Sequence, residues 1–586
     1  AGRVLSAAEL QGIDDRLNAT MRRLAASDPN WQAKSTAQRV EEAAVAALAD
    51  IEREAARKVA NVQRQAVATE QIQGRIQTLS DAYQGGQTRG LVEEINNTSH
   101  YADAVKRESV SNLVDLVEAT SSGEGASMGR RVAMFLFDAE NHAMTKDLVS
   151  EIFAKGQAGT GNALAKSGAQ AWLKVIENLR ERFNAAGGDV GRLDYGYIPM
   201  AHDAARIRDA GRGLLNRAPT LAEAKDAWTA GVLPKLDRRR YVREDGSRMS
   251  DAEVTDFLRA AFDTLVSDGM NKQTPGAFKG TGARANRGSE SRLIHFKDGE
   301  AYLAYNREFG SGSMYDAMTS HIGAMARDIA LVERWGPNPN QQYRLQSDLA
   351  MMADGGIKRI GWVKPQAYWD IVSGVTGSPD SARIAAVGMH SRNIQTMGKL
   401  AGAVISSITD LASIMVTANY NKLPYFDLLR NTKMMATKEG REFATAHGVI
   451  AESMINDMNR FQAEHIANNW SGRLANSTMR LSLMNAWTDT VRRGFSMTMQ
   501  QGLGRIAAKP WADLTEWDRS HLTRKGITED DWAVVNQAQL THYKGADYLT
   551  PEAIVAAGDT GWVSAKILGL ITDESEYAVI NPDLTT

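Results

Sequence analysis

Apolar residues recur at intervals of three and four over most of this chain, which is the spacing that puts them on one face of an α-helix. The clearest example begins near Ser35 and runs to Tyr83 with no proline and a single late glycine. Its small apolar residues, separated by Glu and Arg, include Val40, Ala44, Ala47, Ile51, Ala55 and Val59. A stripe of this kind on a charged helix packs against neighbouring helices, so we predict a long-helix region over residues 1–85.

The same spacing predicts further helices along the chain. Their approximate ranges are 89–119, 128–155, 160–186, 202–215, 298–309, 312–334 and 340–354. Gly85 and Gly86 mark a break after the first region, and Ser250 with Glu253 has the spacing of a capping box at the start of another helix. No stretch of useful length alternates as a strand does. We therefore expect a mainly α fold, an elongated multi-helix array with little or no sheet.

Composition shifts and turn signals divide the chain into five expected regions. These are a long-helix region at 1–85, a helical domain at 86–220, a second helical domain at 221–380, a Met-rich helical region at 381–509, and a helix-and-loop region at 510–586. With 586 residues, the chain exceeds what one compact core normally holds. It opens without an initiator methionine, and we expect it to be a processed product or a piece of a longer protein.

Residues 400–420 form the stretch that comes nearest to a membrane-spanning helix. On a helical wheel its small polar residues fall within about 60° of one another, and larger apolar residues take the opposite side. The polar set is Ser406, Asp410, Ser413 and Thr417, and the apolar set is Val404, Ile408, Leu411 and Met415. The apolar side chains nearly balance the cost of inserting Asp410 into a bilayer, so a single copy of this helix is marginal as a span.

Two interpretations of this membrane-compatible helix stay open. In an isolated chain it would be a buried helix of a soluble bundle, with Asp410 hydrogen-bonded. In a ring of copies, the polar residues would line water or a neighbouring subunit while the apolar face meets lipid or protein. The candidate channel or interface face is therefore Ser406, Asp410, Ser413 and Thr417.

Residues 274–292 form the densest candidate for binding phosphate. Their cations stand among four glycines and are Lys279, Arg284, Arg287 and Arg292. Glycines let backbone N–H groups approach an anion, and guanidinium groups match phosphate oxygens. The order of residues is not that of a nucleotide-binding loop. We expect either a solvated connector or a contact with a nucleic-acid backbone or a lipid headgroup.

The motifs of this chain nominate neither a catalyst nor a metal site. Asp138 and His142 lie four residues apart and His202 adjoins Asp203, but no second pair at ligand spacing accompanies them. Hydrogen bonding on helix surfaces is the simpler interpretation of both pairs. The stretch GQAGTGNA at 156–163 follows a predicted helix rather than a strand, so it lacks the setting of a dinucleotide fingerprint. We predict no catalytic residues, no metal and no cofactor.

Composition and charge narrow the class of protein. Apolar residues make up 43% of the chain and charged residues 24%, which excludes a disordered tail. A formal net charge of −2 gives no general attraction to nucleic acid, so DNA contact would be local. The chain has no cysteine, which excludes thiol nucleophiles and cysteine-bound zinc. That absence fits either a cytosolic chain or one that crosses an oxidising compartment.

Five strings in the last two thirds of the chain are distinctive. They are GYIPMAHD, RRRYVREDG, GARANRGSESRLIHFKDGEAYLAYNREFG, HIGAMARDIALVERWGPNP and MNAWTDTVRRGF. Over about residues 190–586 the chain resembles large internal virion proteins of short-tailed bacteriophages and related prophages. The resemblance implies a structural protein that is stored in the capsid, ejected ahead of the DNA, and assembled into a tube or channel across the host envelope.

The resemblance also implies partners and locations. The partners would be further copies of the chain, other ejection, portal or tail proteins, phage DNA and the host inner membrane. The chain would occupy the capsid interior first, and the host periplasm and inner membrane after ejection. The resemblance further implies a longer protein that continues past the last residue of this chain, in a family of which some members carry a peptidoglycan-cleaving domain. Two alternatives remain: a soluble capsid-interior scaffold or DNA-organising protein, and a cell-wall hydrolase whose catalytic motif is not recognisable.

Overall fold

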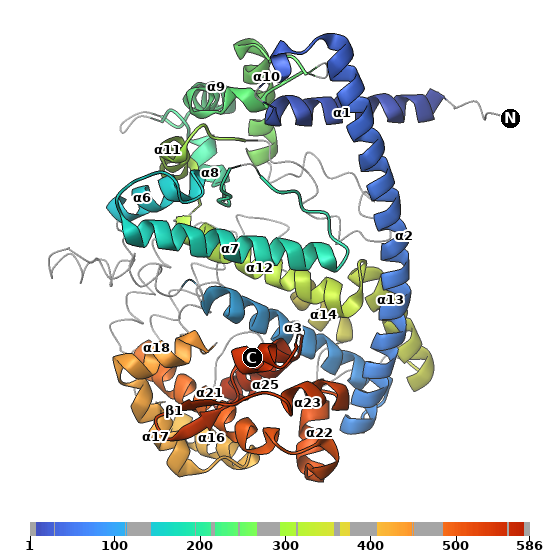
Figure 1. Cartoon of the computed structure of the whole chain (residues 1–586), viewed down its shortest axis with the longest axis vertical. Helices are drawn as coiled ribbons and strands as arrows, with labels where there is room; N and C mark the ends of the chain where they lie inside the picture. Colours follow the sequence, from blue (N-terminus) through green and yellow to red (C-terminus); the bar gives the residue numbers. More distant parts are fainter. Residues whose placement is uncertain are drawn as a thin grey trace. The chain divides into compact units, whose positions relative to one another are not determined.

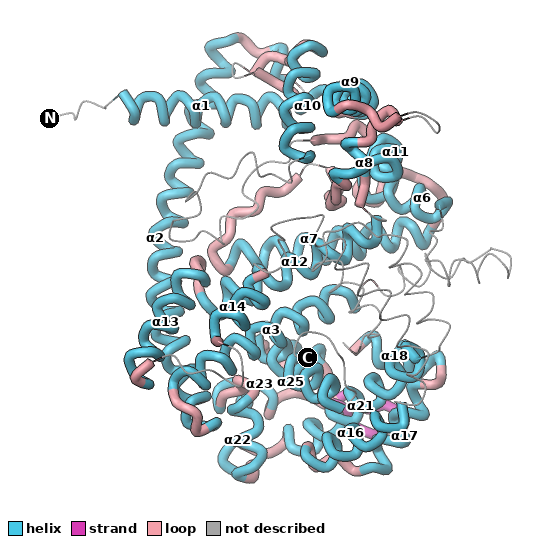
Figure 2. Tube along the Cα trace, turned by 180° about the vertical axis from the view of Figure 1, so that it is seen from behind, coloured by secondary structure: helices cyan, strands magenta, loops and turns pink. Residues whose placement is uncertain are grey.

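Helices make up nearly all of the regular structure, which confirms the predicted mainly α fold (Figures 1 and 2). The computed structural model describes residues 7–28, 30–111, 113, 142–193, 195–212, 217–243, 246–266, 294–311, 314–356, 364–374, 407–447, 449, 484–559 and 562–578. Within these ranges the only sheet is an antiparallel pair of strands, β1 (Thr541–Tyr543) and β2 (Ala546–Tyr548). The expectation of little sheet is therefore also confirmed.

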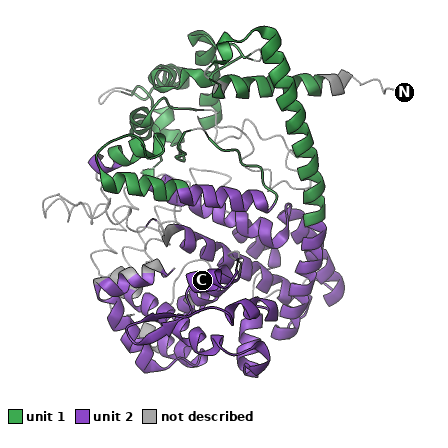
Figure 3. Ribbon diagram, in the orientation of Figure 1, with its two compact units in different colours: residues 1–64, 146–173, 187–314 green, residues 65–145, 174–186, 315–586 purple. Residues whose placement is uncertain are grey.

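The chain divides into two compact units, each built from separate stretches of sequence (Figure 3). Unit 1 takes residues 1–64, 146–173 and 187–314, and unit 2 takes residues 65–145, 174–186 and 315–586. Four helices, α2, α6, α7 and α12, contribute residues to both units. The five regions expected from the sequence follow one another along the chain, so they are a different division from these interleaved units.

Unit 1 is assembled from helices around an aromatic core. Its elements are α1 (Ala7–Ser27), η1 (Trp31–Ala33), α2 (Thr36–Tyr83), α6 (His142–Phe153), α7 (Ala163–Ala185), α8 (Ala204–Arg208), α9 (Leu221–Val232), η2 (Leu233–Lys235), η3 (Arg238–Arg240), α10 (Asp251–Val266) and α11 (Gly299–Phe309). In α11, Tyr305 packs its ring against Phe296 and Phe309, with centroids 5.1 and 5.4 Å apart. Tyr302 donates a hydrogen bond to the carbonyl of Pro199 at 3.0 Å, which holds the loop before α8 against this core.

One face of α2 packs within unit 1 and differs from the predicted stripe. Ion pairs of 2.6 Å join Arg16 of α1 to Glu54 and Arg23 to Asp50. Ala43 is fully buried on the same side. Of the predicted stripe Ala47 is buried, whereas the larger residues Val40 and Val59 are exposed. Ala44 and Ala55 are exposed as well, so only one edge of the predicted stripe faces inward.

The break between α2 and the next helix, α3 (Gln87–Ser111), is fixed by a glycine and a carboxylate. Gly86 has φ +79°, a left-handed conformation that glycine adopts without steric cost. The carboxylate of Asp354 accepts hydrogen bonds from the backbone N–H groups of Gln87 and Thr88, at 3.0 and 2.8 Å. A Cβ on Gly86 would lie 2.8 Å from one of these carboxylate oxygens, so the position requires glycine. The predicted break is confirmed.

The predicted capping box is confirmed as well. The hydroxyl of Ser250 accepts from the N–H of Glu253, while the carboxylate of Glu253 accepts from the N–H of Ser250 at 2.7 Å. The two residues satisfy donors that the start of α10 would otherwise leave without partners.

Unit 2 surrounds two buried helices. Besides its parts of α2, α6, α7 and α3, its elements are α12 (Met314–Trp335), α13 (Pro339–Asp354), α14 (Pro365–Ser373), α16 (Ser407–Tyr420), α17 (Tyr425–Met435), α18 (Lys438–Ala446), α21 (Met484–Ala507), η6 (Trp511–Asp513), α22 (Glu516–Arg524), α23 (Glu529–Val535), β1, β2, α24 (Pro551–Ala556) and α25 (Trp562–Ala578). Residues 491–501 of α21 are buried on every side. Residues 563–575 of α25 are buried too, except for the half-buried Lys566. Because these helices are buried on all sides, their polar residues lie inside unit 2 and form hydrogen bonds and ion pairs there.

Candidate interaction surface and the buried polar network

The helices α16 and α17 form a hairpin with an apolar inner side. Lys422 has φ +53° in the turn, and the N–H of Leu423 donates to the carbonyl of Ala418 at 2.8 Å. Ile414, Ala418, Leu423 and Leu428 are buried in one hydrophobic cluster with residues of α21 and α25. Burial of these side chains holds the hairpin on unit 2.

The outer side of the same hairpin is apolar too. Its exposed large residues are Met415, Val416, Tyr420, Tyr425, Phe426 and Leu429, which together we call the α16–α17 surface. Phe426 is 75% exposed and Leu429 71% exposed, one helical turn apart on α17. Single exposed apolar residues are ordinary, but several on two adjoining helices mark a surface that binds another molecule or a membrane.

The charges beside this surface are mainly positive. Lys422 and Lys433 are exposed, and Arg430 is half-buried; the Lys422 ammonium also lies 4.0 Å from Asp518. The one acidic residue between positions 413 and 436 is Asp427. It is buried and contacts the guanidinium groups of Arg430 and Arg505. An apolar surface bordered by cations is the combination found on proteins that bind at anionic lipid headgroups.

The polar side chains of the hairpin point into the unit. Asn421 donates to a carboxylate oxygen of Glu574 at 2.6 Å. Asn431 is fully buried, donates to Thr498 at 3.0 Å, and accepts from the hydroxyl of Tyr548 at 3.0 Å. These bonds satisfy the NH2 group of Asn421 and both ends of the Asn431 amide, groups that would be costly to bury without partners.

The predicted channel face is only partly described. Ser406 lies outside the described residues, and of Asp410 only its place in α16 is known. Ser413 is half-buried, and Thr417 is buried inside unit 2 at 8% exposure. Within the single chain, then, Thr417 does not line water, because it packs inward with Ile414 and Ala418, whereas Met415 of the predicted apolar set is exposed. Whether these positions line water in an assembly stays a prediction.

Two further expectations concerned a membrane-spanning helix and a phosphate-binding loop. Among the helices that the structure describes, none combines the length and the apolar character needed to cross a bilayer. The loop at 274–292, with Lys279, Arg284, Arg287 and Arg292, lies outside the described residues. Its contact with phosphate stays a prediction.

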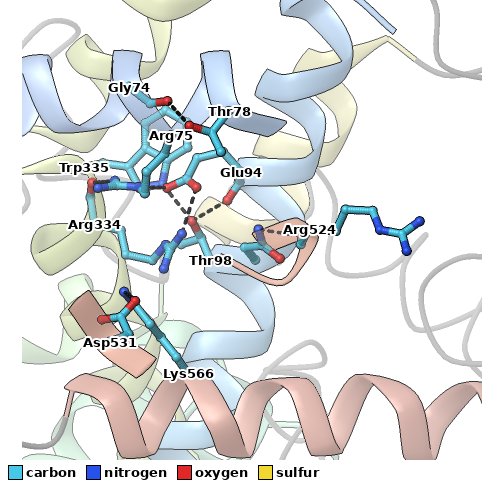
Figure 4. A network of polar contacts seen from close by, with 11 residues as sticks. Gly74, Arg75, Thr78, Glu94, Thr98, Arg334, Trp335, Arg524, Asp531 and Lys566 are labelled. Atoms are coloured by element: carbon cyan, nitrogen blue, oxygen red, sulfur yellow. Dashed lines mark hydrogen bonds and ion pairs between the residues drawn. The ribbon is translucent and has the colours of Figure 1, made fainter. Parts of the chain in front are cut away.

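A carboxylate in the interior of unit 2 holds two guanidinium groups (Figure 4). Glu94 of α3 is fully buried and accepts from Arg75 of α2 at 2.9 Å and from Arg334 of α12 at 2.8 Å. Arg75 also donates to the carbonyl of Arg334 at 2.7 Å. Burial alone would raise the pKa of Glu94, but the two guanidinium charges outweigh it and lower that pKa. Three helices are thus joined by one buried ionic contact.

The charges around this contact are already paired. A small hollow beside it is lined by Asn97, His100, Tyr101, Arg334, Lys525, Ala565, Lys566, Gly569 and Leu570. Arg334 is bound to Glu94, and Lys566 lies 2.6 Å from Asp531. Lys525 contacts Asp573. Because each of these cations has an acidic partner, the network serves to hold helices together rather than to attract an anionic ligand.

A buried histidine, His521, lies near the ion pair formed by Lys525 and Glu574. His521 of α22 stacks on Trp517 with ring centroids 4.8 Å apart, and its Nε2 is 3.9 Å from Glu574. Burial lowers the pKa of His521 to about 4. The nearby Glu574 opposes this shift, but its charge is offset by Lys525 at 3.0 Å.

The glycine-rich stretch at 156–163 encloses a carboxylate of the chain itself. The buried Glu151, on α6, accepts from the N–H groups of Ala158 and Thr160 at 3.1 and 3.0 Å, and from the Thr160 hydroxyl at 2.7 Å. Gly156, Gly159 and Gly161 have positive φ, which wraps the loop around it. The Thr160 bonds lower the pKa of Glu151. The donors are occupied, so the loop has a structural role.

We predict that replacing Glu151 by alanine lowers the free energy of unfolding of unit 1 by about 1–3 kcal/mol, since three donors lose their acceptor. Chemical denaturation followed by circular dichroism measures this loss. Glu300→Ala is the matched control, because Glu300 is an exposed carboxylate of the same unit. Equal stability of the two variants would show that the loop does not depend on Glu151.

The sequence candidates for a metal have local partners or lie outside the described residues. His202 forms a 2.8 Å hydrogen bond with the hydroxyl of Tyr305, and Asp203 caps α8. Asp138 is outside the described residues, and His142 begins α6. Within the ranges that the structure describes, no three acidic or histidine side chains are placed to hold a metal ion.

Comparisons with models of protein families, with curated proteins and with solved structures found no match to this chain. Its function is therefore inferred from its own residues.

Proposed function

We propose that this chain is a structural bacteriophage virion protein that is ejected into the host and associates with copies of itself into a tube or channel for genome delivery. The five distinctive strings support the bacteriophage class. Portal, tail and other ejection proteins, phage DNA and the host inner membrane are the proposed partners. The capsid interior is the proposed location before ejection, and the host periplasm and inner membrane the locations after it.

The observation that carries this proposal is the α16–α17 surface. It presents several large apolar side chains to solvent, and its α16 residues belong to the apolar stretch 400–420. Tyr420 and Tyr425 at the turn and Phe426 beside them are the residue types that lie at the boundary between headgroups and acyl chains. Lys422 and Lys433 can then reach anionic headgroups. We therefore propose that this surface lies on the lipid of the host inner membrane.

Flotation with anionic phosphatidylglycerol vesicles tests this proposal. We expect the wild-type chain to float and the double variant Phe426→Ser/Leu429→Ser to bind at least about tenfold more weakly, because it loses two large apolar contacts. Met352→Ser is the matched control, since Met352 is 78% exposed on α13 of the same unit. Wild-type protein that stays with the soluble fraction, or a control that loses as much binding, would overturn the proposed contact.

A further inference from the structure

A second apolar surface runs along α2 within unit 1. Its members alternate at intervals of three and four residues and are Val45, Leu48, Glu52, Ala55, Val59 and Val62, which we call the α2 stripe. All six are exposed, and the four larger apolar side chains are 58–68% exposed. Residues Ala43, Ala47 and Asn61, on the opposite side of the helix, are buried. The stripe therefore faces away from the packed side of α2.

The spacing of the α2 stripe is that of a coiled-coil seam. Apolar residues that alternate at three and four stay on the side of a helix that meets a second helix. The stripe spans 18 residues, or about 27 Å at 1.5 Å per residue. Ala49 and Ala56, both exposed, lie beside it and are small enough for another backbone to approach. A helix with a matching stripe is the partner that this surface fits.

Glu52 determines how a second copy of the same helix would align. In a parallel pair, two Glu52 carboxylates would share one layer of the seam and repel each other. In an antiparallel pair centred between residues 53 and 54, Val45 meets Val62 and Leu48 meets Val59. Glu52 then meets Ala55, and Lys58 of the second copy lies about one turn away. Lys58 is exposed but lies 2.7 Å from Glu54 of its own helix, so the antiparallel alignment needs no pairing between Lys58 and Glu52.

We infer that the α2 stripe is a contact between two copies of this chain, packed antiparallel about a two-fold axis. The charge pattern supports this arrangement, because two Glu52 carboxylates repel each other in parallel alignment, whereas each meets the small Ala55 in antiparallel alignment. A two-fold contact of this kind is the commonest way in which identical chains associate. The dimer is one contact within the self-assembly proposed above and rests on that proposed function.

Single thiols test the alignment directly, because the chain has no cysteine of its own. We expect an equal mixture of the Leu48→Cys and Val59→Cys variants to be joined into a dimer by a short bismaleimide. Each variant alone should react at least about tenfold less, since two copies of residue 48 lie about 16 Å apart along an antiparallel pair. Equal cross-linking of each single variant would overturn the antiparallel contact in favour of a parallel one.

Sedimentation equilibrium tests the contact without cross-links. We expect Leu48→Asp to weaken self-association more than tenfold and Leu221→Asp, an exposed position of the same unit, to leave it unchanged. An unaltered circular dichroism spectrum shows that both variants fold. If the chain assembles but Leu48→Asp assembles equally well, the α2 contact is wrong and the proposed function stands. If the wild-type chain stays a monomer at every concentration and with vesicles, both are wrong.

Discussion

Replacing Glu94 by alanine is expected to lower the free energy of unfolding of unit 2 by about 3–5 kcal/mol, because the change leaves the buried guanidinium group of Arg334 and the half-buried one of Arg75 without their carboxylate. Arg75 and Arg334 are held at 2.9 and 2.8 Å by Glu94, which is fully buried. Chemical denaturation measures the loss. Glu70→Ala is the matched control, since Glu70 is an exposed carboxylate of the same unit and should change stability by no more than about 0.5 kcal/mol.

The lowered pKa of Glu94 also predicts how the stability of unit 2 changes at acidic pH. Since the pKa of Glu94 is lowered in the folded chain, its ionic contacts stabilise the fold fully above the unfolded value of 4.5. That stabilisation is lost as the pH falls through the folded pKa.

If Glu94→Ala lowers the free energy of unfolding by less than about 1 kcal/mol, this contact does not join the three helices as proposed.

Acidification between pH 6.5 and pH 4 is expected to destabilise unit 2 by on the order of 3 kcal/mol through His521. Burial holds the pKa of this histidine at about 4, against 6.5 when it is unfolded. The unfolded chain therefore takes up a proton in this range and the folded chain does not, so stability falls as the pH falls. Below about pH 4 both states are protonated and the decline from this residue ends.

The variant His521→Phe tests whether His521 causes this pH dependence of stability. The variant keeps a ring that can stack on Trp517 and has no proton to take up, so its stability should change much less over this pH range. His542→Phe is the matched control because His542 is exposed. If His521→Phe retains the whole pH dependence, other groups cause it, and His521 is not held neutral by burial.

The helical fold was predictable because it depends on local spacing. The range predicted as 312–334 is observed as Met314–Trp335, and 340–354 as Pro339–Asp354. The break at Gly86 and the helix start at Ser250 were predictable too, since a left-handed glycine and a capping box each depend on only a few neighbouring residues.

The interior contacts were not predictable, because they join residues far apart in the sequence. Glu94 and Arg334 are separated by 240 positions, and each resembles an ordinary surface charge on its helix. The division into interleaved units could not be predicted either, because it too depends on contacts between residues far apart in the sequence. The side of α16 that faces solvent depends on packing against α25, which periodicity alone cannot decide when both sides of the helix carry apolar residues. A usable signal was present in α17, where Tyr425, Phe426 and Leu429 follow a Lys-Leu-Pro turn.

The most direct test of self-assembly for genome delivery is negative-stain electron microscopy of the purified chain, with and without anionic vesicles. The proposed function predicts multi-subunit rings or tubes on the vesicle surface, which the Phe426→Ser/Leu429→Ser variant fails to form there. Uniform single chains in both samples, with vesicles left bare at all protein concentrations, would contradict it.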